Sequence, residues 1–265
     1  MSAILETRSA SKHFGGLKAV NEVTMEVHRG EILGIIGPNG AGKTTFFNLI
    51  TATYKLTSGR VLFEGRDISH LSAEKVARLG IARTFQNIKL FKFLSVLENV
   101  KVGFHTRTRT SLWDSILHTK RYRADEQTAK EEGMAILERV GLGDRAQLMA
   151  GNLPYGLQRR LEIARALALS PKILLLDEPA AGMNPSETAE LMEFIKKLNT
   201  DGLTVVVIEH DMKFVMNLCD RIVVINYGQK LAEGTPTEVT GNQQVVDAYL
   251  GAGLTIDRRR GGKRA

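Results

Sequence analysis

The chain has 265 residues, of which 43% are hydrophobic and 25% are charged, an ordinary composition for a globular protein. That length is enough for one large domain or two small ones, each with a buried core. No apolar run approaches the roughly 18 residues of a membrane span. Residues 1–7 also lack the basic start and apolar stretch of a secretory signal. We therefore expect neither a membrane-embedded chain nor a secreted one.

The formal net charge of +7 raises the question of a nucleic-acid or anionic-membrane partner. Five of the basic residues stand close together near the C-terminus: Arg258, Arg259, Arg260, Lys263 and Arg264. We therefore expect residues 251–265 to form a flexible basic tail near a membrane surface, and we expect no nucleic-acid partner.

The chain has one cysteine, Cys219, which excludes an internal disulfide and agrees with a reducing compartment. We expect Cys219 to pack as a small hydrophobic side chain. A reactive thiol is the alternative.

In chain order, residues 3–36 are predicted to be strands. Val23, Met25 and Val27 alternate with polar residues, which is the pattern of a half-buried strand. Phe14 precedes two glycines in an expected loop. It is either a core side chain or a partly exposed ring that can stack on a nucleotide base.

A glycine-rich pattern follows at residues 37–45, Gly-Pro-Asn-Gly-Ala-Gly-Lys-Thr-Thr, and it fits Gly-x4-Gly-Lys followed by Ser or Thr. Residues 31–36 before it read as a buried strand, and residues 45–52 after it read as the start of a helix. This order points loop amides and the positive end of a helix dipole at one anion. Lys43 can reach the β- and γ-phosphates, and the Thr44 hydroxyl can ligate Mg2+.

The pattern predicts that the chain binds a nucleoside triphosphate. The residues expected to surround it are Gly37, Asn39, Gly40, Ala41, Gly42, Lys43, Thr44 and Thr45.

Beyond the loop, residues 58–59 are predicted to form a turn. Ser72 can cap a helix that ends at Gly80, where a left-handed residue is expected. Residues 81–85 then read as a strand that leads to Gln86. A glutamine there is either a surface residue or a side chain that meets a metal-bound water.

From residue 95 to residue 170 the pattern is helical. Ser95 and Glu98 fit a capping box. Two further helices are predicted from apolar residues at helical spacing, namely Ala129, Ile136, Leu137 and Val140, then Leu157, Leu161, Ala164 and Leu167. Residues 106–125 are polar and carry Trp113, and they are the least readable stretch. A helical insert in a strand–helix framework is the simplest account.

Strands return at residues 173–176, which lead into Asp177 and Glu178. An aspartate that closes a buried strand can hold Mg2+ through water. The carboxylate after it would face the terminal phosphate and take a proton from the attacking water. Two solvated loop carboxylates are the alternative.

A further buried strand at residues 205–208 is followed by His210. Ligands of open α/β sheets bind at the carboxyl ends of the strands, which favours a phosphate contact for His210 over a purely structural histidine. Between the two strands, Asn184 and Pro185 signal a helix start. Short strands at residues 222–225 and 230–232 and a helix-prone segment at 238–250 complete the chain.

Together these residues resemble the ATP-binding subunits of ABC transporters over nearly the whole chain. The phosphate loop, Gln86 as the Q-loop, the Asp177–Glu178 pair and the switch histidine His210 follow in the order of that family. The family has a signature segment, typically Leu-Ser-Gly-Gly-Gln. Here residues 153–158 read Leu-Pro-Tyr-Gly-Leu-Gln at the matching place before a helix.

The resemblance implies an α/β fold: a P-loop NTPase with a RecA-like core, an N-terminal antiparallel β-subdomain and an inserted α-helical subdomain. The implied division is residues 1–86 and 171–250 for the nucleotide-binding core, 87–170 for the helical insert and 251–265 for the tail.

The resemblance also implies the site. Glu178 would be the general base, helped by His210, Gln86 and Lys43. Phe14 would stack on adenine. Mg2+ would be held by Thr44, Gln86 and Asp177. ATP sites in the family are shared in a head-to-tail dimer, so the signature residues of each subunit would close the partner's ATP. These are Leu153, Pro154, Tyr155 and Gly156.

Residues 81–87 and 177–185 look like the branched-chain amino acid importer class, and the long stretch after Gln86 is similar to the longer of its two ATPases. This implies uptake of branched-chain or other hydrophobic amino acids through separate membrane permease subunits. A solute-binding protein would act indirectly. The second ATPase subunit would be a copy or, preferably, a different chain. The expected location is the cytoplasmic face of the inner membrane. Residues 87–93 would be the face that docks on the permease.

Three departures from the family pattern stand out. Pro154 replaces the signature serine and lacks a backbone N–H, Leu157 replaces the glutamine, and Asn184 replaces the aspartate of the D-loop. We expect looser ATP-driven closure, or dependence on a partner ATPase with a complete signature.

Two other functions remain open at this stage. An ABC subunit for lipid or lipopolysaccharide export, or for import of another substrate such as urea or an amide, shares every catalytic residue. A soluble ABC ATPase acting on nucleic acid is less favoured, because such proteins usually carry two cassettes or a long coiled coil. No residue of the chain need touch the transported molecule, so the sequence leaves that molecule open.

Overall fold

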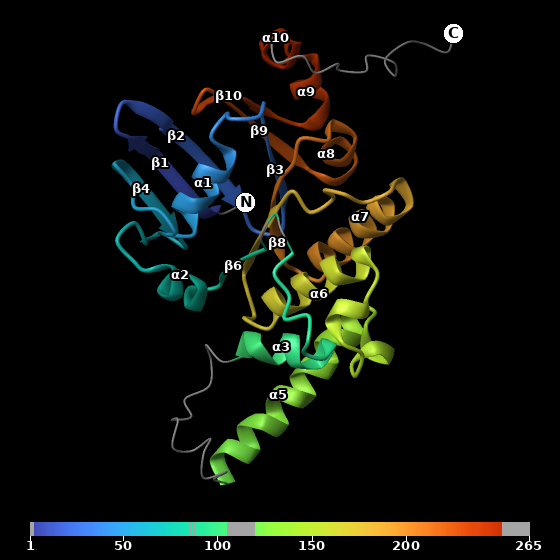
Figure 1. Ribbon diagram of the computed structural model, residues 1–265. Coiled ribbons are helices and arrows are strands. Elements are labelled where there is room, and N and C mark those ends of the chain that lie inside the picture. The colour runs from blue at the N-terminus through green and yellow to red at the C-terminus, as the bar shows by residue number, and fades with distance from the viewer. Residues whose placement is uncertain (1–2, 85, 87, 105–119, 251–265) are drawn as a thin grey trace, which may run out of the picture. The chain divides into compact units, whose positions relative to one another are not determined.

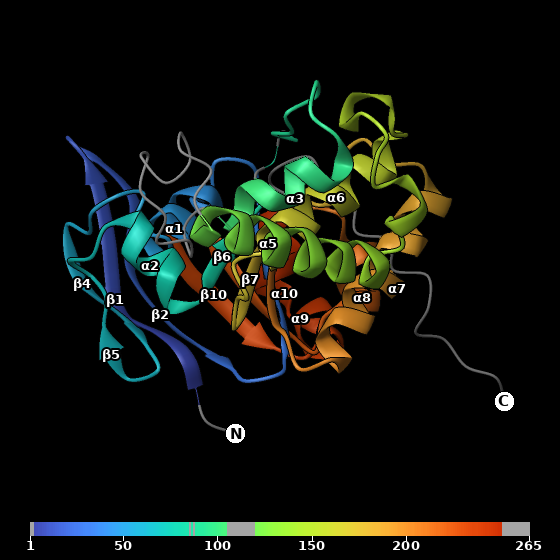
Figure 2. The same cartoon turned by 90° about the horizontal axis from the view of Figure 1, so that it is seen from below.

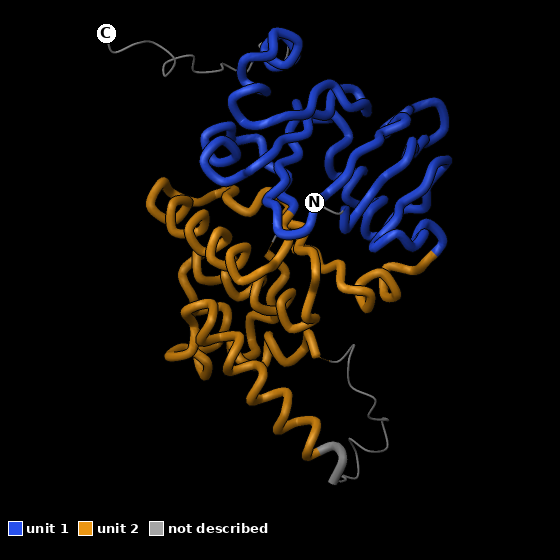
Figure 3. Tube along the Cα trace, turned by 180° about the vertical axis from the view of Figure 1, so that it is seen from behind, with its two compact units in different colours: residues 1–70, 206–265 blue, residues 71–205 orange. Residues whose placement is uncertain are grey.

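The computed structural model describes residues 3–84, 86, 88–104 and 120–250 (Figure 1). The chain folds into two compact units. Unit 1 is residues 1–70 with 206–265, and unit 2 is residues 71–205 (Figure 3). The predicted boundaries at residues 86, 170 and 250 separate a nucleotide-binding core, a helical insert and a tail, which are not the two compact units, and they stay a prediction.

Unit 1 contains a four-stranded antiparallel sheet in the order β2-β1-β4-β5. Its strands are β1 (Ala3–Phe14), β2 (Leu17–His28), β4 (Ser58–Phe63) and β5 (Arg66–Asp67). On β2, Val23, Met25 and Val27 are buried and the residues between them are exposed, as the period-two pattern predicts.

The other strands of unit 1 are mostly buried, except for the last strand in the chain, which has no buried residue. β3 (Ile32–Ile36) pairs in parallel with β9 (Arg221–Asn226), which pairs antiparallel with β10 (Gln229–Gly234). The last three residues of β8 (Thr204–Ile208) belong to unit 1. Directly after β8, the backbone N–H of Glu209 donates to the Ile35 carbonyl. β3 is buried at every position, which explains its continuous apolar run.

The helices of unit 1 are α1 (Lys43–Ile50), α8 (Met212–Leu218), α9 (Pro236–Gly241) and α10 (Gln243–Leu250). α8 lies close to β3 at Gly34, where an added Cβ would stand 2.9 Å from the Val215 side chain and 3.0 Å from the Cys219 sulfur. Cys219 is buried there, so the prediction that it packs as a small hydrophobic side chain is confirmed.

Unit 2 begins with α2 (Ala73–Leu79), whose predicted caps are confirmed: the Ser72 side chain accepts from the Lys75 N–H, and Gly80 is left-handed at φ 112°. β6 (Ile81–Arg83) follows and pairs in parallel with β7 (Ile173–Asp177). α7 (Pro185–Thr200) comes after β7 and starts with a capping box between Asn184 and Glu187.

The helical part of unit 2 contains α3 (Val96–Phe104), α5 (Lys120–Arg139) and α6 (Tyr155–Leu167), with short 3-10 turns at Gly143–Arg145 and Ala150–Asn152. α3 packs against both α5 and α6, and Figures 1 and 2 show the three helices side by side. The predicted capping box of Ser95 and Glu98 starts α3. Among the described residues, no helix has the length and apolar character needed to cross a membrane.

Several local predictions differ from the structure. Phe14 ends β1 in a hairpin with β2 and does not lie in a loop. Residues 58–59 belong to β4. The helix after the phosphate loop begins at Lys43, two residues early, and α8 was not predicted. These errors share a cause: strand pairing and short helices are decided by tertiary contacts more than by local propensity. Trp113 and the basic tail lie outside the described residues.

Candidate functional site

The phosphate-loop pattern joins β3 to α1 in unit 1, as predicted. Gly37 passes so close to β9 that an added Cβ would stand 2.0 Å from the Ile225 carbonyl oxygen. Gly42 is left-handed at φ 100°, and a Cβ there would stand 2.2 Å from the Ala19 oxygen. Both positions require glycine, so the loop glycines are explained by packing as well as by ligand approach.

Lys43 is buried within the loop that it ends. Its ammonium donates to the carbonyl oxygens of Gly37 at 2.7 Å and Pro38 at 3.0 Å. Gly42, as the N-cap of α1, has no side chain to occupy the first helix amides. A positive charge and a helix N-terminus therefore meet in one loop, which is the arrangement that binds phosphate. Thr44 and Thr45 follow on the first turn of α1, exposed and half-buried.

Phe14 is 45% exposed, which favours the second of its two interpretations, a ring open to a ligand. It packs edge-on against Tyr54 with ring centroids 5.5 Å apart, and the Lys12 ammonium lies 5.0 Å from the Phe14 centroid. Sequence reasoning missed Tyr54 and Lys12. Tyr54 lies in the connection between α1 and β4, far from Phe14 in the sequence, and only its aromatic character offered a signal.

His210 follows β8 in unit 1 with its side chain half exposed. The imidazole Nδ1 lies 3.7 Å from the buried carboxylate of Glu209, which also accepts the His210 N–H at 3.2 Å. Asp211 caps α8 by accepting from the N–H groups of Lys213 and Phe214. The chain thus turns sharply after β8, and this turn holds His210 at the strand end.

Asp177 ends β7 in unit 2 and is buried. Its Oδ2 accepts from the Arg83 guanidinium at 2.6 Å, whereas its Oδ1 is buried without a hydrogen-bond partner. A buried carboxylate oxygen left in this way fits a role for Asp177 beside Mg2+, which takes one or two protein carboxylates and keeps its own waters. Sequence reasoning assigned no role to Arg83 of β6, because no neighbouring residue in the sequence indicates that it pairs with Asp177.

Glu178 and Gln86 lie together in unit 2. The Gln86 amide Nε2 donates to Glu178 Oε2 at 2.7 Å. Glu178 has a positive φ of 46°, a conformation that a non-glycine residue adopts at a cost of roughly 1 kcal/mol or more. Other non-glycine residues, among them Ser9, Glu22 and Tyr227, share this conformation, so it does not by itself decide between a catalytic carboxylate and a solvated loop residue.

The signature-like segment, residues 153–158, leads into α6. Pro154 is the N-cap and offers no side-chain hydrogen bond. Tyr155 takes the place of a signature glycine, and its hydroxyl donates to the Ala181 carbonyl in the D-loop at 2.9 Å. Leu153 is buried and its carbonyl accepts from the Gln158 amide at 2.8 Å. The Tyr155 hydroxyl therefore links the signature-like segment to the D-loop, although the two residues are 26 positions apart in the sequence.

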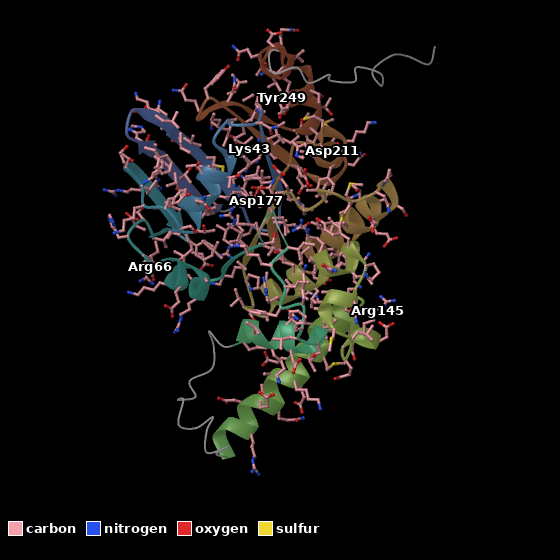
Figure 4. All side chains as sticks on the ribbon, in the orientation of Figure 1. Lys43, Arg66, Arg145, Asp177, Asp211 and Tyr249 are labelled. Carbon is pink, nitrogen blue, oxygen red and sulfur yellow. The ribbon has the colours of Figure 1, made fainter. Side chains whose placement is uncertain are left out.

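Each unit gathers part of the predicted site. Unit 1 holds the phosphate loop, Phe14 and His210, and unit 2 holds Gln86, the acidic pair and the signature-like segment. Figure 4 labels Lys43 at the start of α1 and Asp177 at the end of β7. Their roles in hydrolysis stay predictions.

Comparison with known proteins defines the class. Residues 20–181 match the family model described as ABC transporter, a span that contains the phosphate loop, the signature-like segment and the acidic pair. The chain belongs to the ABC transporter family, as an ATP-binding cassette. Residues 229–254 also match the model described as branched-chain amino acid ATP-binding cassette transporter.

Its similar relatives include the high-affinity branched-chain amino acid transport ATP-binding proteins LivG of Salmonella typhimurium and BraF of Pseudomonas aeruginosa. Each is 47% identical over 249 residues, which are 94% of this chain and 98% of the relative. The probable branched-chain amino acid transport ATP-binding protein LivG of Archaeoglobus fulgidus is 38% identical over 252 residues, 94% of this chain and 96% of that relative.

Solved structures confirm the predicted fold class. A nucleotide-free ATP-binding cassette of an ABC transporter superposes with a TM-score of 0.82 at 34% identity, over 94% of this chain and 99% of that chain. The ADP conformation of an ATP-binding cassette of an ABC transporter gives a TM-score of 0.83 at 34% identity, over 95% of this chain and 100% of that chain.

Proposed function

We propose that the chain is the ATP-hydrolysing subunit of an importer that takes up branched-chain amino acids through separate permease subunits. The observation that carries the substrate class is the 47% identity, over 94% of the chain, to LivG and BraF, whose names specify branched-chain amino acid transport. The phosphate loop and its buried lysine support the ATP-binding half of the proposal.

In this proposal Lys43 and the loop amides bind the phosphates of ATP, and Phe14 stacks on the base. Thr44, Asp177 and Gln86 hold Mg2+, which would neutralise charge that develops on the phosphates. The orphaned Oδ1 of Asp177 supports the metal assignment.

Glu178 is the proposed general base. Its carboxylate would accept a proton from an attacking water once the hydrogen bond from the Gln86 amide is broken. His210 contacts the γ-phosphate in the same proposal, and the turn around Asp211 keeps it at the end of β8.

The chain would work as a peripheral subunit at the cytoplasmic face of the inner membrane, with a solute-binding protein acting indirectly from the other side. Permease subunits would dock on residues 87–93, where Phe91 is 50% and Phe93 91% exposed. Exposed aromatic side chains are common at protein interfaces. A second ATPase subunit, preferably a different chain, would complete both ATP sites.

The test is Glu178→Gln in the transporter complex that co-purifies with the chain. The amide cannot accept a proton, so ATP turnover should fall at least about a hundredfold while ATP still binds. Turnover at the wild-type rate would remove Glu178 from the role. In vesicles that contain the same complex, ATP-dependent uptake of radiolabelled leucine should be seen with the wild type. Transport of urea but not of leucine would contradict the proposed substrate.

A further inference from the structure

Helix α6 buries an ion pair on the side opposite the predicted apolar stripe of Leu157, Leu161, Ala164 and Leu167. The guanidinium Nη1 of Arg159 donates to Glu162 Oε2 at 2.7 Å, and the two side chains are 0% and 1% exposed. A buried pair of this kind is weak evidence for stability, because removing two charges from water offsets most of their attraction. A pair of apolar side chains would fill the same space, so the charges call for another explanation.

The second terminal nitrogen of the Arg159 guanidinium suggests why the charge is kept. Nη2 donates to the backbone carbonyl oxygen of Gln86 at 3.0 Å. The Gln86 side chain in turn donates to Glu178 at 2.7 Å. A continuous chain of hydrogen bonds therefore runs from the interior of α6 through the Q-loop residue to the proposed general base. All of it lies within unit 2.

The segment after Gln86 is held in the same manner. Arg165, six residues further along α6, donates to the Lys89 carbonyl, and its guanidinium lies 6.0 Å from the Phe91 ring centroid. Asn99 of α3 is fully buried and bonds to both the N–H of Phe91 at 2.9 Å and its carbonyl at 3.0 Å. Lys89 and Phe91 are thus fixed by side chains of the helical part through main-chain atoms.

The signature-like segment and Arg159 share one helix. Tyr155 is the first residue of α6, and Arg159 lies one turn later on the same hydrogen-bonded rod. A movement of the N-terminal end of α6 therefore moves the guanidinium that holds the Gln86 backbone.

We propose that Arg159 is a positioning residue: by holding the backbone carbonyl of Gln86, it sets the Gln86 amide against Glu178 and couples α6 to the general base. Glu162 orients the guanidinium for this task. The inference rests on the proposed ATPase function and adds a residue that acts through Gln86.

The test is a double-mutant cycle in the co-purified transporter complex. The double variant Arg159→Met with Glu162→Met removes both charges, so that no buried carboxylate is left unpaired. Arg159→Lys keeps a positive charge beside Glu162 but lacks the planar guanidinium that can donate in two directions. Each is combined with Gln86→Ala, which keeps the backbone carbonyl and removes the side chain that Arg159 positions. Arg160→Met is the matched control, because Arg160 is the next residue of α6 and pairs with Glu190 of α7. Thermal unfolding identifies the variants that fold.

With Gln86 present, we expect the double methionine variant and Arg159→Lys to lower kcat about tenfold, with the KM for ATP within about twofold of wild type. In the Gln86→Ala background the same changes should lower kcat less than about twofold further, because the positioned group is already gone. Arg160→Met should lower kcat equally in both backgrounds, or not at all.

An equal fall of kcat in both backgrounds for the Arg159 variants would show a merely structural role and overturn the inference. An unchanged kcat in the Gln86-containing background would also overturn it. A wild-type complex that does not hydrolyse ATP would instead overturn the proposed function, so the two failures are distinguishable.

Discussion

At the scale of single residues, Cys219 shows how burial decides reactivity. The side chain lies at the C-terminal end of α8, next to Gly34 of β3. Burial, with smaller contributions from the negative charges of Asp220 and Glu209, raises the pKa of the Cys219 thiol well above its ordinary value of 9.0. The thiolate is the reactive form, so the native protein should keep this thiol inert.

We therefore expect iodoacetamide at about pH 8 to alkylate the native chain at least about a hundredfold more slowly than the chain unfolded in guanidinium. The chain has only this cysteine, so mass spectrometry follows one site in both states. Native and unfolded chains that react at the same rate would show that the thiol is exposed and that the reactive alternative is correct.

At the scale of elements, the phosphate loop depends on the close approach of three segments. Gly42 stands between α1 and the Ala19 carbonyl, and its left-handed φ of 100° starts the helix. Gly228, in the turn between β9 and β10, donates its N–H to the Ala41 carbonyl at 2.9 Å and supports the loop from the other side. The loop shape is therefore a property of its surroundings as well as of its own glycines.

Gly42→Ala should lower ATP affinity at least about tenfold, because the new methyl meets a backbone oxygen that cannot move away and the loop must shift. Calorimetric titration with ATP measures the effect. Gly202→Ala is the matched control: Gly202 has a similar φ of 96°, but an added Cβ meets nothing within 4 Å. That variant should cost about 1–2 kcal/mol of stability from backbone strain and leave ATP affinity unchanged. Equal ATP affinity for both variants would contradict the packing argument.

At the scale of the whole molecule, the departures from the signature bear on assembly. Pro154 caps α6 without a hydroxyl, so it has no group equivalent to the signature serine. Asn184 accepts the Glu187 N–H at 3.0 Å as the N-cap of α7, a role that aspartate would fill equally. The change to asparagine thus keeps the cap and removes a negative charge from the D-loop.

We expect the isolated Glu178→Gln chain to remain monomeric with ATP at low micromolar concentration, because the segment that would close the partner's ATP lacks its hydroxyl. A second ATPase with a complete Leu-Ser-Gly-Gly-Gln should restore an ATP-dependent dimer in sedimentation velocity. Tight ATP-dependent dimerisation of the isolated variant would contradict this prediction.

The sequence alone determined the features whose partners lie within a few residues. The caps at Ser72, Ser95 and Asn184 were predictable because each side chain bonds a backbone group three residues on. The phosphate loop was equally local, since its glycines and lysine belong to one turn. The order of these motifs along the chain then indicated the family, which the comparisons confirmed.

Only the tertiary structure decided which distant residues meet. Arg83 and Asp177 are 94 residues apart, Gln86 and Glu178 are 92 apart, and Arg159 reaches Gln86 across 73. Each of these polar side chains has many possible partners in the chain, and no local pattern selects one. The burial of Arg159 is the clearest case, because the backbone carbonyl that its guanidinium binds is supplied by a different segment of the fold.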